Sequence, residues 1–123
     1  MPVDVLIVDD SAAIRKILQR VLTQTNLSIG KVLEAANGIE ALHALQQQTV
    51  GLIFSDINMP NMDGLQFLNE LKGNDQWKNV PVLMISTEGS QAKVMEAVQR
   101  GALGFVRKPF TPDQIIEKLA GML

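Results

Sequence analysis

Short apolar runs alternate with amphipathic segments along the chain. The apolar runs are rich in β-branched residues and bounded by turn-forming residues, which is typical of buried strands. They predict strands at residues 3–8, 31–36, 50–55, 80–86 and 104–107. Between these runs, apolar residues recur at helical spacing, as expected for helices with one buried face. These helices are expected to begin after the capping residues Ser11, Asn37, Asp63, Ser90 and Thr111.

The alternation produces five strand–helix units with short connections and without a low-complexity segment. Such units form a parallel sheet with helices on both faces. Five strands suit the open, doubly wound order 2-1-3-4-5, in which ligands bind at the carboxyl edge where the strand order reverses. The predicted fold is therefore α/β, with a single domain over residues 1–123 and a functional edge beside the first and third strands.

Three carboxylates stand at this predicted edge. Asp9 and Asp10 follow the first strand, and Asp56 follows the third. Like charges this close repel one another, and burial adds to the cost. A fold keeps such a cluster when a hard cation lies among the oxygens, and Mg²⁺ binds carboxylates and water in near-octahedral geometry. A partly filled metal shell leaves room for a phosphate, so the cluster indicates phosphoryl chemistry.

Two further polar residues are expected at the same edge. Ser86 closes the fourth strand, and Lys108 follows the fifth. The metal and the lysine would neutralise the oxygens of a transferred phosphoryl group, and the hydroxyl would donate a hydrogen bond to it. Asp56 is the candidate nucleophile, because it lies in the middle of the edge and carboxylates form acyl phosphates.

Composition argues against several other classes of function. The chain is 46% hydrophobic and 20% charged, as in ordinary globular domains. Its net charge is −2 and it has no run of Lys or Arg, so nucleic-acid binding is not expected. It contains no cysteine, which excludes disulfides and thiol nucleophiles. Without a signal-like start or a long apolar stretch, the protein is expected in the cytoplasm, with no membrane insertion.

Four motifs lie at the ends of the predicted strands: V-D-D-S (8–11), S-D-I-N-M-P-N-M-D-G (55–64), P-V-L-M-I-S-T-E (81–88) and F-V-R-K-P-F (105–110). Each is weak alone, but together, in this order and spacing, they are highly specific. With them, essentially the whole chain resembles the receiver domains of two-component response regulators, and most nearly the single-domain chemotaxis (CheY-type) regulators. The flavodoxin-like strand order inferred above is known from that type of protein, so it is not an independent result.

The resemblance implies a phosphorylation-activated signalling switch of a two-component system. Asp56 would accept a phosphoryl group from a histidine kinase or phosphotransfer protein. Asp10, Asp56 and the backbone carbonyl of Asn58 would coordinate Mg²⁺ or Mn²⁺, and Asp9 would act mainly through a bound water. Lys108 would bridge to the phosphoryl group. The domain would catalyse only its own phosphorylation and dephosphorylation, as a monomer.

The resemblance also implies how the signal leaves the site. Ser86 would swing toward the phosphoryl group and Phe105 would turn inward. This change would alter the face formed by the fourth helix, the fifth strand and the fifth helix, where an output protein would bind the phosphorylated form. Phe105 keeps the packing change but has no hydroxyl, whereas the family often has Tyr. The Lys108–Pro109 bond is predicted to be cis, which would aim Lys108 into the site.

Two residues are expected to set the lifetime of the phosphorylated state. Asn58 and Glu88 lie two places after Asp56 and Ser86, and they would border the approach of the water that hydrolyses the acyl phosphate. Both are polar and small or flexible, so they can hydrogen-bond water and do not block it. A short-lived signal is therefore predicted.

Two other functions stay open on the residues alone. One is a metal-dependent phosphatase with an aspartyl nucleophile, although haloacid-dehalogenase-like enzymes carry Asp-x-Asp at the first strand instead of adjacent Asp9-Asp10. The other is a flavin-binding module on the same fold, although the acidic segment 9–12 would repel a phosphate unless a metal intervened. Thr87, His43 and Trp77 receive no functional role, and His43 is expected at the surface.

Overall fold

Strands and helices alternate strictly in the computed structural model, which describes residues 2–87 and 90–122. The strands are Val3–Val8 (β1), Ile29–Ala35 (β2), Leu52–Ser55 (β3), Val82–Ser86 (β4) and Gly104–Arg107 (β5). The helices are Ala12–Leu22 (α1), Gly38–Gln47 (α2), Gly64–Lys72 (α3), Gln91–Gln99 (α4) and Pro112–Met122 (α5).

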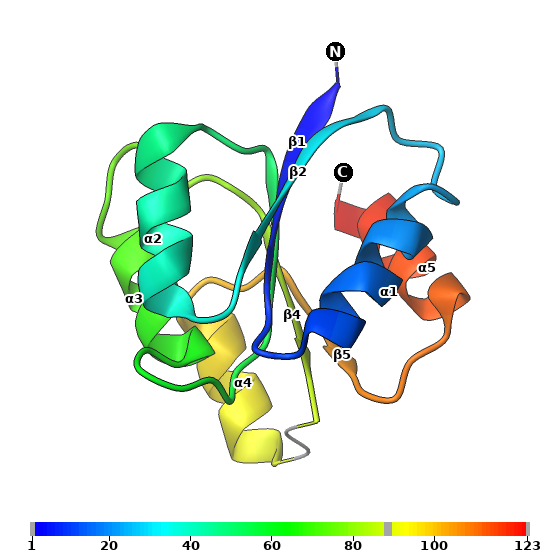
Figure 1. The fold of residues 1–123 in the computed structure, drawn as a ribbon. Helices are drawn as coiled ribbons and strands as arrows, with labels where there is room; N and C mark the ends of the chain where they lie inside the picture. The colour runs from blue at the N-terminus through cyan, green and yellow to red at the C-terminus, as the bar shows by residue number, and fades with distance from the viewer. Residues whose placement is uncertain (1, 88–89, 123) are drawn as a thin grey trace.

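The strands form one parallel sheet in the order β2-β1-β3-β4-β5. This order confirms the prediction. Helices α1 and α5 cover one face of the sheet, and α2, α3 and α4 cover the other (Figure 1). β2 lies on one side of β1, and the chain then crosses to β3 on the other side. The strand order therefore reverses between β1 and β3. The carboxyl ends of these two strands therefore border the crevice in which this fold binds ligands.

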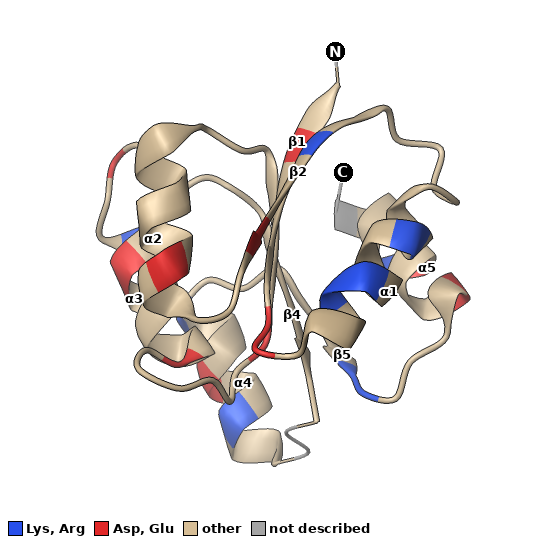
Figure 2. Ribbon diagram, in the orientation of Figure 1, with Lys and Arg blue, Asp and Glu red and all other residues tan. Residues whose placement is uncertain are grey.

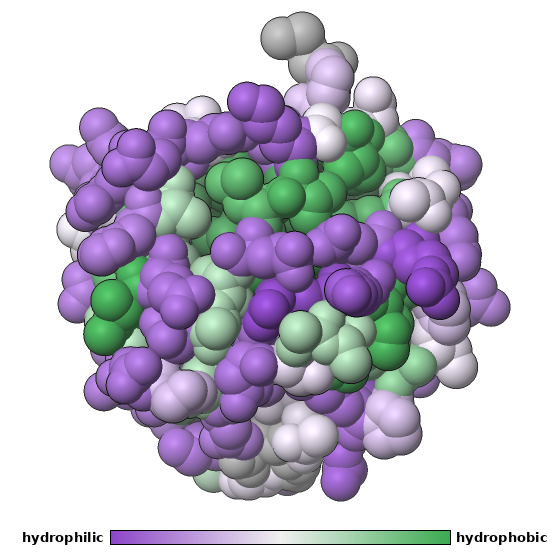
Figure 3. Space-filling view, viewed as in Figure 1, coloured by the Kyte–Doolittle hydropathy of each residue, from purple (hydrophilic) through white to green (hydrophobic). Residues whose placement is uncertain are grey.

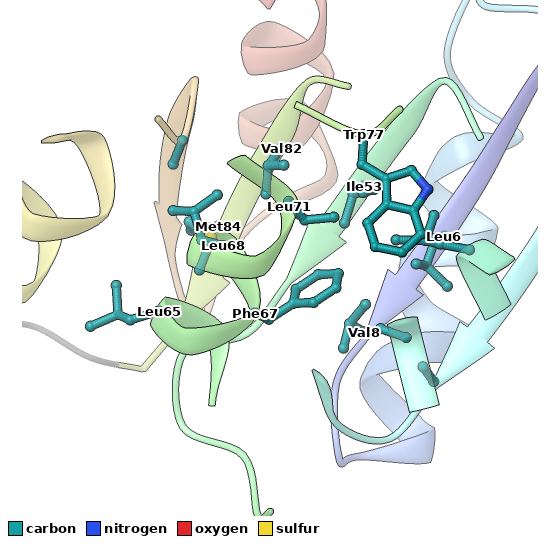
Figure 4. Packing of buried hydrophobic residues seen from close by; sticks show 14 of the residues in the cluster. Leu6, Val8, Ile53, Leu65, Phe67, Leu68, Leu71, Trp77, Val82 and Met84 are labelled. Carbon is teal, nitrogen blue, oxygen red and sulfur yellow. The ribbon is translucent and has the colours of Figure 1, made fainter. Parts of the chain in front are cut away.

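Two apolar clusters fill the spaces between the sheet and its helix layers. Leu6 and Ile7 are neighbours in β1, yet each is fully buried in a different cluster. Burial on both faces explains why the central strands read as continuous apolar runs. Trp77, which had no role in the sequence analysis, belongs to the cluster under α2, α3 and α4, and its ring lies among those side chains (Figure 4). Its role is core packing. His43 is exposed, as expected.

Three strand starts differ from the sequence prediction by two residues each. The fourth strand begins at Val82 and not at 80, because Pro81 has no N–H to donate to a neighbouring strand. The third begins at Leu52, after Gly51. The second begins at Ile29, two residues earlier than predicted, because the strand continues through Gly30, a residue type that usually marks a turn.

Side-chain capping begins each helix where the sequence predicted. The side chains of Ser11, Asn37, Asp63 and Ser90 each accept the N–H of the residue three places on, and Thr111 does the same for Gln114 at 3.3 Å. Helix α4 ends at Gln99, and Gly101, just after the capping residue Arg100, has a φ of 108° in the left-handed region that favours glycine. Hydrogen bonds to these capping side chains thus fix the residues at which the helices begin.

The surface is mostly hydrophilic on the face shown in Figure 3, with hydrophobic residues gathered over the region of β1 and β2. In the edge strand β2, Val32 and Leu33 are partly buried, and each packs against one of the two core clusters. Among the described helices, none has the length and apolar character needed to cross a membrane.

Candidate functional site

The parallel ladder carries Asp9 and Asp56 to the same edge of the sheet. The Asp9 N–H donates to the Ala35 carbonyl at 3.0 Å, and the Asp56 N–H donates to the Val8 carbonyl at 2.9 Å. The pairing of β1 with its two neighbours thus continues one residue beyond the strand ends. Figure 2 shows the acidic segment at the carboxyl end of β1, where the chain turns into α1. Both carboxylates are therefore placed by backbone hydrogen bonds.

Carboxylate oxygens of Asp9, Asp10 and Asp56 lie within 4.8 Å of one another. Asp9 and Asp56 are only 1% and 6% exposed, whereas Asp10 faces solvent. Three oxygen donors, partly buried and open on one side, match the preference of a hard divalent cation that keeps some of its water. The cluster predicted from the sequence is therefore present, and its donors fit such a metal.

Lys108 reaches into this cluster from the end of β5. Its Nζ donates to Asp9 Oδ2 at 2.6 Å and to Asp56 Oδ2 at 3.1 Å, and its side chain is 11% exposed. Burial alone would lower the pKa of Lys108, but hydrogen bonds and charge from the two carboxylates raise it above its usual value. Burial raises the pKa of the Asp9 carboxyl, against the opposing influence of Lys108. Lys108 is therefore a positively charged group, fixed by two hydrogen bonds, that partly offsets the negative charge of the three carboxylates.

The two oxygens of the Asp56 carboxylate have different partners. Oδ1 accepts the backbone N–H of Ile57 at 2.7 Å, and Oδ2 accepts the Lys108 ammonium at 3.1 Å. The carboxylate is therefore held in one orientation, with one oxygen turned to the backbone and the other to the cation.

Ser86 and Lys108 are joined through the backbone at the end of the sheet. The Lys108 N–H donates to the Ser86 carbonyl at 2.8 Å, and Ser86 is fully buried. The Lys108–Pro109 peptide bond is cis, which confirms that prediction. Ser86 at the end of β4 and Lys108 just after β5 thus lie at the edge of the sheet that carries the acidic cluster.

The remaining predicted residues lie around this centre or outside the described chain. Asn58 is exposed, two residues after Asp56. Phe105 is half-buried, pairs with Met84 in the sheet, and packs against the cluster under α2, α3 and α4. Thr87 is exposed beside Ser86. Glu88 falls outside the described residues.

Arg15 is a site contact that the sequence analysis missed. Its Nη1 donates to the Asp9 carbonyl at 2.6 Å, and its Nε bonds to Glu34 of β2 at 2.9 Å. The guanidinium therefore connects the acidic loop after β1 to the edge strand. The only signal in the sequence is a basic residue in the second turn of a predicted helix, which is too common to be informative.

Comparisons with known proteins identify the class. Residues 5–120 match the family described as "Response regulator receiver domain", so the chain belongs to this family. A chemotaxis protein CheY homologue of Campylobacter jejuni is 37% identical over 96% of this chain and 90% of its own length. CheY4 of Vibrio cholerae is 36% identical with a TM-score of 0.88, covering 100% of both chains. CheY in a CheX–CheY–BeF3–Mg²⁺ complex from Borrelia burgdorferi is 31% identical with a TM-score of 0.89, over 98% of this chain and 89% of that one.

The chain is thus a receiver domain of the CheY type, which acts as a phosphorylation-activated signalling switch. The phosphatase and the flavin-binding module left open by the residues are not supported by these relatives. Receiver domains bind a divalent metal, and the cluster of Asp9, Asp10 and Asp56 suits one.

Proposed function

We propose that Asp56 is the phosphoacceptor and that the described site performs the transfer. The observation that carries this proposal is the setting of Asp56, whose Oδ2 accepts the Lys108 ammonium and whose carboxylate belongs to the cluster with Asp9 and Asp10. Oδ2 forms the new P–O bond as the P–N bond of a phosphohistidine donor breaks. Lys108 then neutralises charge on the transferred group, whose oxygens are stabilised mainly by electrostatics.

The metal is proposed to be Mg²⁺, with Mn²⁺ as a substitute. Asp10, Asp56 and the Asn58 carbonyl would hold it directly, and Asp9 would hold it through a water. When bound, it supplies positive charge for the phosphoryl oxygens. Asp9 also holds Lys108 through its Oδ2. That hydrogen bond keeps the ammonium beside the acceptor carboxylate.

The signal is proposed to leave through Ser86 and Phe105. Phe105 lines a groove of about 520 Å³ that is bordered by β5 and α5, together with Arg107, Lys118 and others. On α4 and the segment that joins it to β5, Met95 and Val98 are 52% and 53% exposed, and Leu103 is 59% exposed. A face made of α4, β5 and α5 would therefore combine exposed apolar side chains with the half-buried ring of Phe105, and an inward turn of that ring would alter this face.

The partners proposed are a histidine kinase or phosphotransfer protein and a downstream protein that prefers the phosphorylated form. The B. burgdorferi relative forms a complex with CheX, which supports a protein target of this kind. The chain itself would catalyse only its own phosphorylation and dephosphorylation.

Acetyl phosphate with Mg²⁺ tests the proposed function directly. We expect one phosphoryl group per chain by intact mass, located at Asp56 by peptide mapping, and no sustained turnover of other phosphate esters. Sustained turnover of varied esters, or labelling at another residue, would contradict the proposal.

Mg²⁺ is expected to raise the melting temperature of the native chain and to leave that of Asp10→Asn unchanged. Binding at about ten times Kd stabilises by roughly 1.4 kcal/mol, or about 5 °C for a chain of this size. In EDTA, Asp10→Asn should be at least as stable as the native chain, because it removes one of three repelling charges. Thermal melts at matched ionic strength, set with NaCl, provide the control. An unchanged native melting temperature over millimolar Mg²⁺ would show that the cluster is not a metal site.

Asn58→Leu and Glu88→Leu are each expected to slow dephosphorylation by about five- to tenfold, which corresponds to one lost hydrogen bond to the attacking water. Phosphorylation should stay near its native rate. The measurement is decay of the phosphorylated form after donor removal, with Mg²⁺ present. Asn79→Leu, at an exposed position outside the site motifs, is the control. Native decay in both site variants would remove the basis for a short-lived signal.

A further inference from the structure

One peptide unit beside the candidate phosphoacceptor is held at both of its polar ends. The carbonyl of Asp56 accepts the hydroxyl of Ser55 at 2.9 Å. The N–H of Ile57, which belongs to the same peptide unit, donates to Asp56 Oδ1 at 2.7 Å. Because a peptide unit is planar, a hydrogen bond that fixes its carbonyl also fixes the direction of its N–H.

Ser55 is well placed to fix this peptide. It is 1% exposed and is the last residue of β3, where it pairs with Val8 of β1 and Met84 of β4. Neighbouring strands on both sides therefore hold its backbone. Within the described residues, its hydroxyl is the hydrogen-bond donor to the Asp56 carbonyl.

Gly64 confines the same carbonyl from another direction. A Cβ built on Gly64 would lie 2.0 Å from the Asp56 carbonyl oxygen, so the backbone of α3 passes directly beside it. The Gly64 N–H also donates to the next carbonyl, that of Ile57, at 2.8 Å. The peptide thus lies between a buried hydroxyl and a closely packed helix start, with little freedom to rotate.

We propose that Ser55 is a positioning residue for phosphoryl transfer. Its hydroxyl orients the Asp56–Ile57 peptide, and the Ile57 N–H then holds Asp56 Oδ1. This leaves Oδ2 turned toward Lys108 as the oxygen that attacks phosphorus. The inference rests on the proposed role of Asp56 as phosphoacceptor. It connects the last residue of β3, through one peptide unit, to the orientation of the reacting carboxylate.

A purely structural role for Ser55 makes a different prediction. In that case, removing the hydroxyl would lower stability but leave the Ile57 N–H on Asp56 Oδ1. Ile53→Val is the matched control, because it deletes one buried methyl from the same strand at a position that pairs with Val82. Its stability loss is of similar size to the loss of one buried hydrogen bond.

The test compares Ser55→Ala with Ile53→Val and the native chain by amide NMR and by phosphorylation. In Ser55→Ala, we expect the Ile57 amide proton to move upfield and to exchange with D₂O about three- to tenfold faster. We also expect the rate with acetyl phosphate and Mg²⁺ to fall about three- to tenfold. Ile53→Val should keep the native shift and exchange rate of the Ile57 amide and the native phosphorylation rate. A native Ile57 amide in Ser55→Ala overturns the inference, and so does an equal change in Ile53→Val.

The amide measurement needs no phosphorylation, so it separates two failures. If the native chain is not phosphorylated at Asp56, the proposed function fails while the Ile57 amide still reports the link to Ser55. If Asp56 is phosphorylated and Ser55→Ala is phosphorylated at the native rate, the positioning role fails alone.

Discussion

Asp56→Asn is expected to abolish phosphorylation while the fold is retained. The substitution keeps the size of the side chain and an oxygen that can accept the Ile57 N–H, but it removes the anionic oxygen that accepts Lys108. An amide is too weak a nucleophile to form the acyl phosphate. Removing one charge from the buried cluster relieves repulsion with Asp9, which offsets the lost ion pair with Lys108, and Lys108 keeps Asp9 as its partner, so the fold should be retained. Intact mass after incubation with acetyl phosphate and Mg²⁺ should show no added phosphoryl group.

Asp75→Asn is the matched control for that experiment. Asp75 carries the same chemical group, but its side chain is 95% exposed and its partner is Lys78. It should be phosphorylated at the native rate. If Asp56→Asn still takes up one phosphoryl group per chain, the acceptor is another residue, and peptide mapping would identify it.

The central part of the site was predictable because strand ends in a parallel sheet share one edge. Asp9 and Asp56 each follow an apolar run, and once the strand order is known their proximity follows. Lys108 was predictable for the same reason, as the polar residue that follows the fifth strand. For these residues, the position in the sequence and the topology together determine the position in space.

The residues that orient these groups were not predictable in the same way. Arg15 acts on the Asp9 carbonyl and Ser55 on the Asp56 carbonyl, and a hydrogen bond to a backbone carbonyl leaves no pattern of residue types in the sequence. Trp77 follows a polar stretch, and only tertiary packing shows that it is buried. Apolar periodicity reports burial within one element, whereas these contacts join different elements or lie outside a periodic segment.

Gly64 illustrates the difference between local preference and tertiary contact. Gly64 is the first residue of α3, and helix propensity alone predicts that alanine there would stabilise the protein by up to about 1 kcal/mol. The structure predicts instead that alanine at this position lowers the free energy of unfolding. A Cβ would lie 2.0 Å from the Asp56 carbonyl oxygen and 2.8 Å from the Ile57 Cα. These are backbone atoms at the end of β3, so they cannot move aside as a flexible side chain would.

Gly64→Ala is therefore expected to lower the free energy of unfolding by about 3 kcal/mol or more, among the larger effects of single substitutions. For a chain of this size, the melting temperature should fall by roughly 10 °C. The displaced backbone belongs to the Asp56–Ile57 peptide, so phosphorylation should also slow in the fraction that stays folded. Denaturant unfolding and thermal melts measure the first effect, and acetyl phosphate labelling below the melting transition measures the second.

Gly121→Ala makes the same substitution where the surroundings permit it. Gly121 lies in α5, and a Cβ there would meet nothing within 4 Å. Helix propensity should then act alone, giving a gain of a few tenths to about 1 kcal/mol, with native phosphorylation. The same Gly→Ala substitution would thus change the free energy of unfolding in opposite directions at two helical positions of this protein. If Gly64→Ala melts within a degree or two of the native chain, α3 can shift away from the Asp56 carbonyl, and the confinement of that peptide is weaker than the distances indicate.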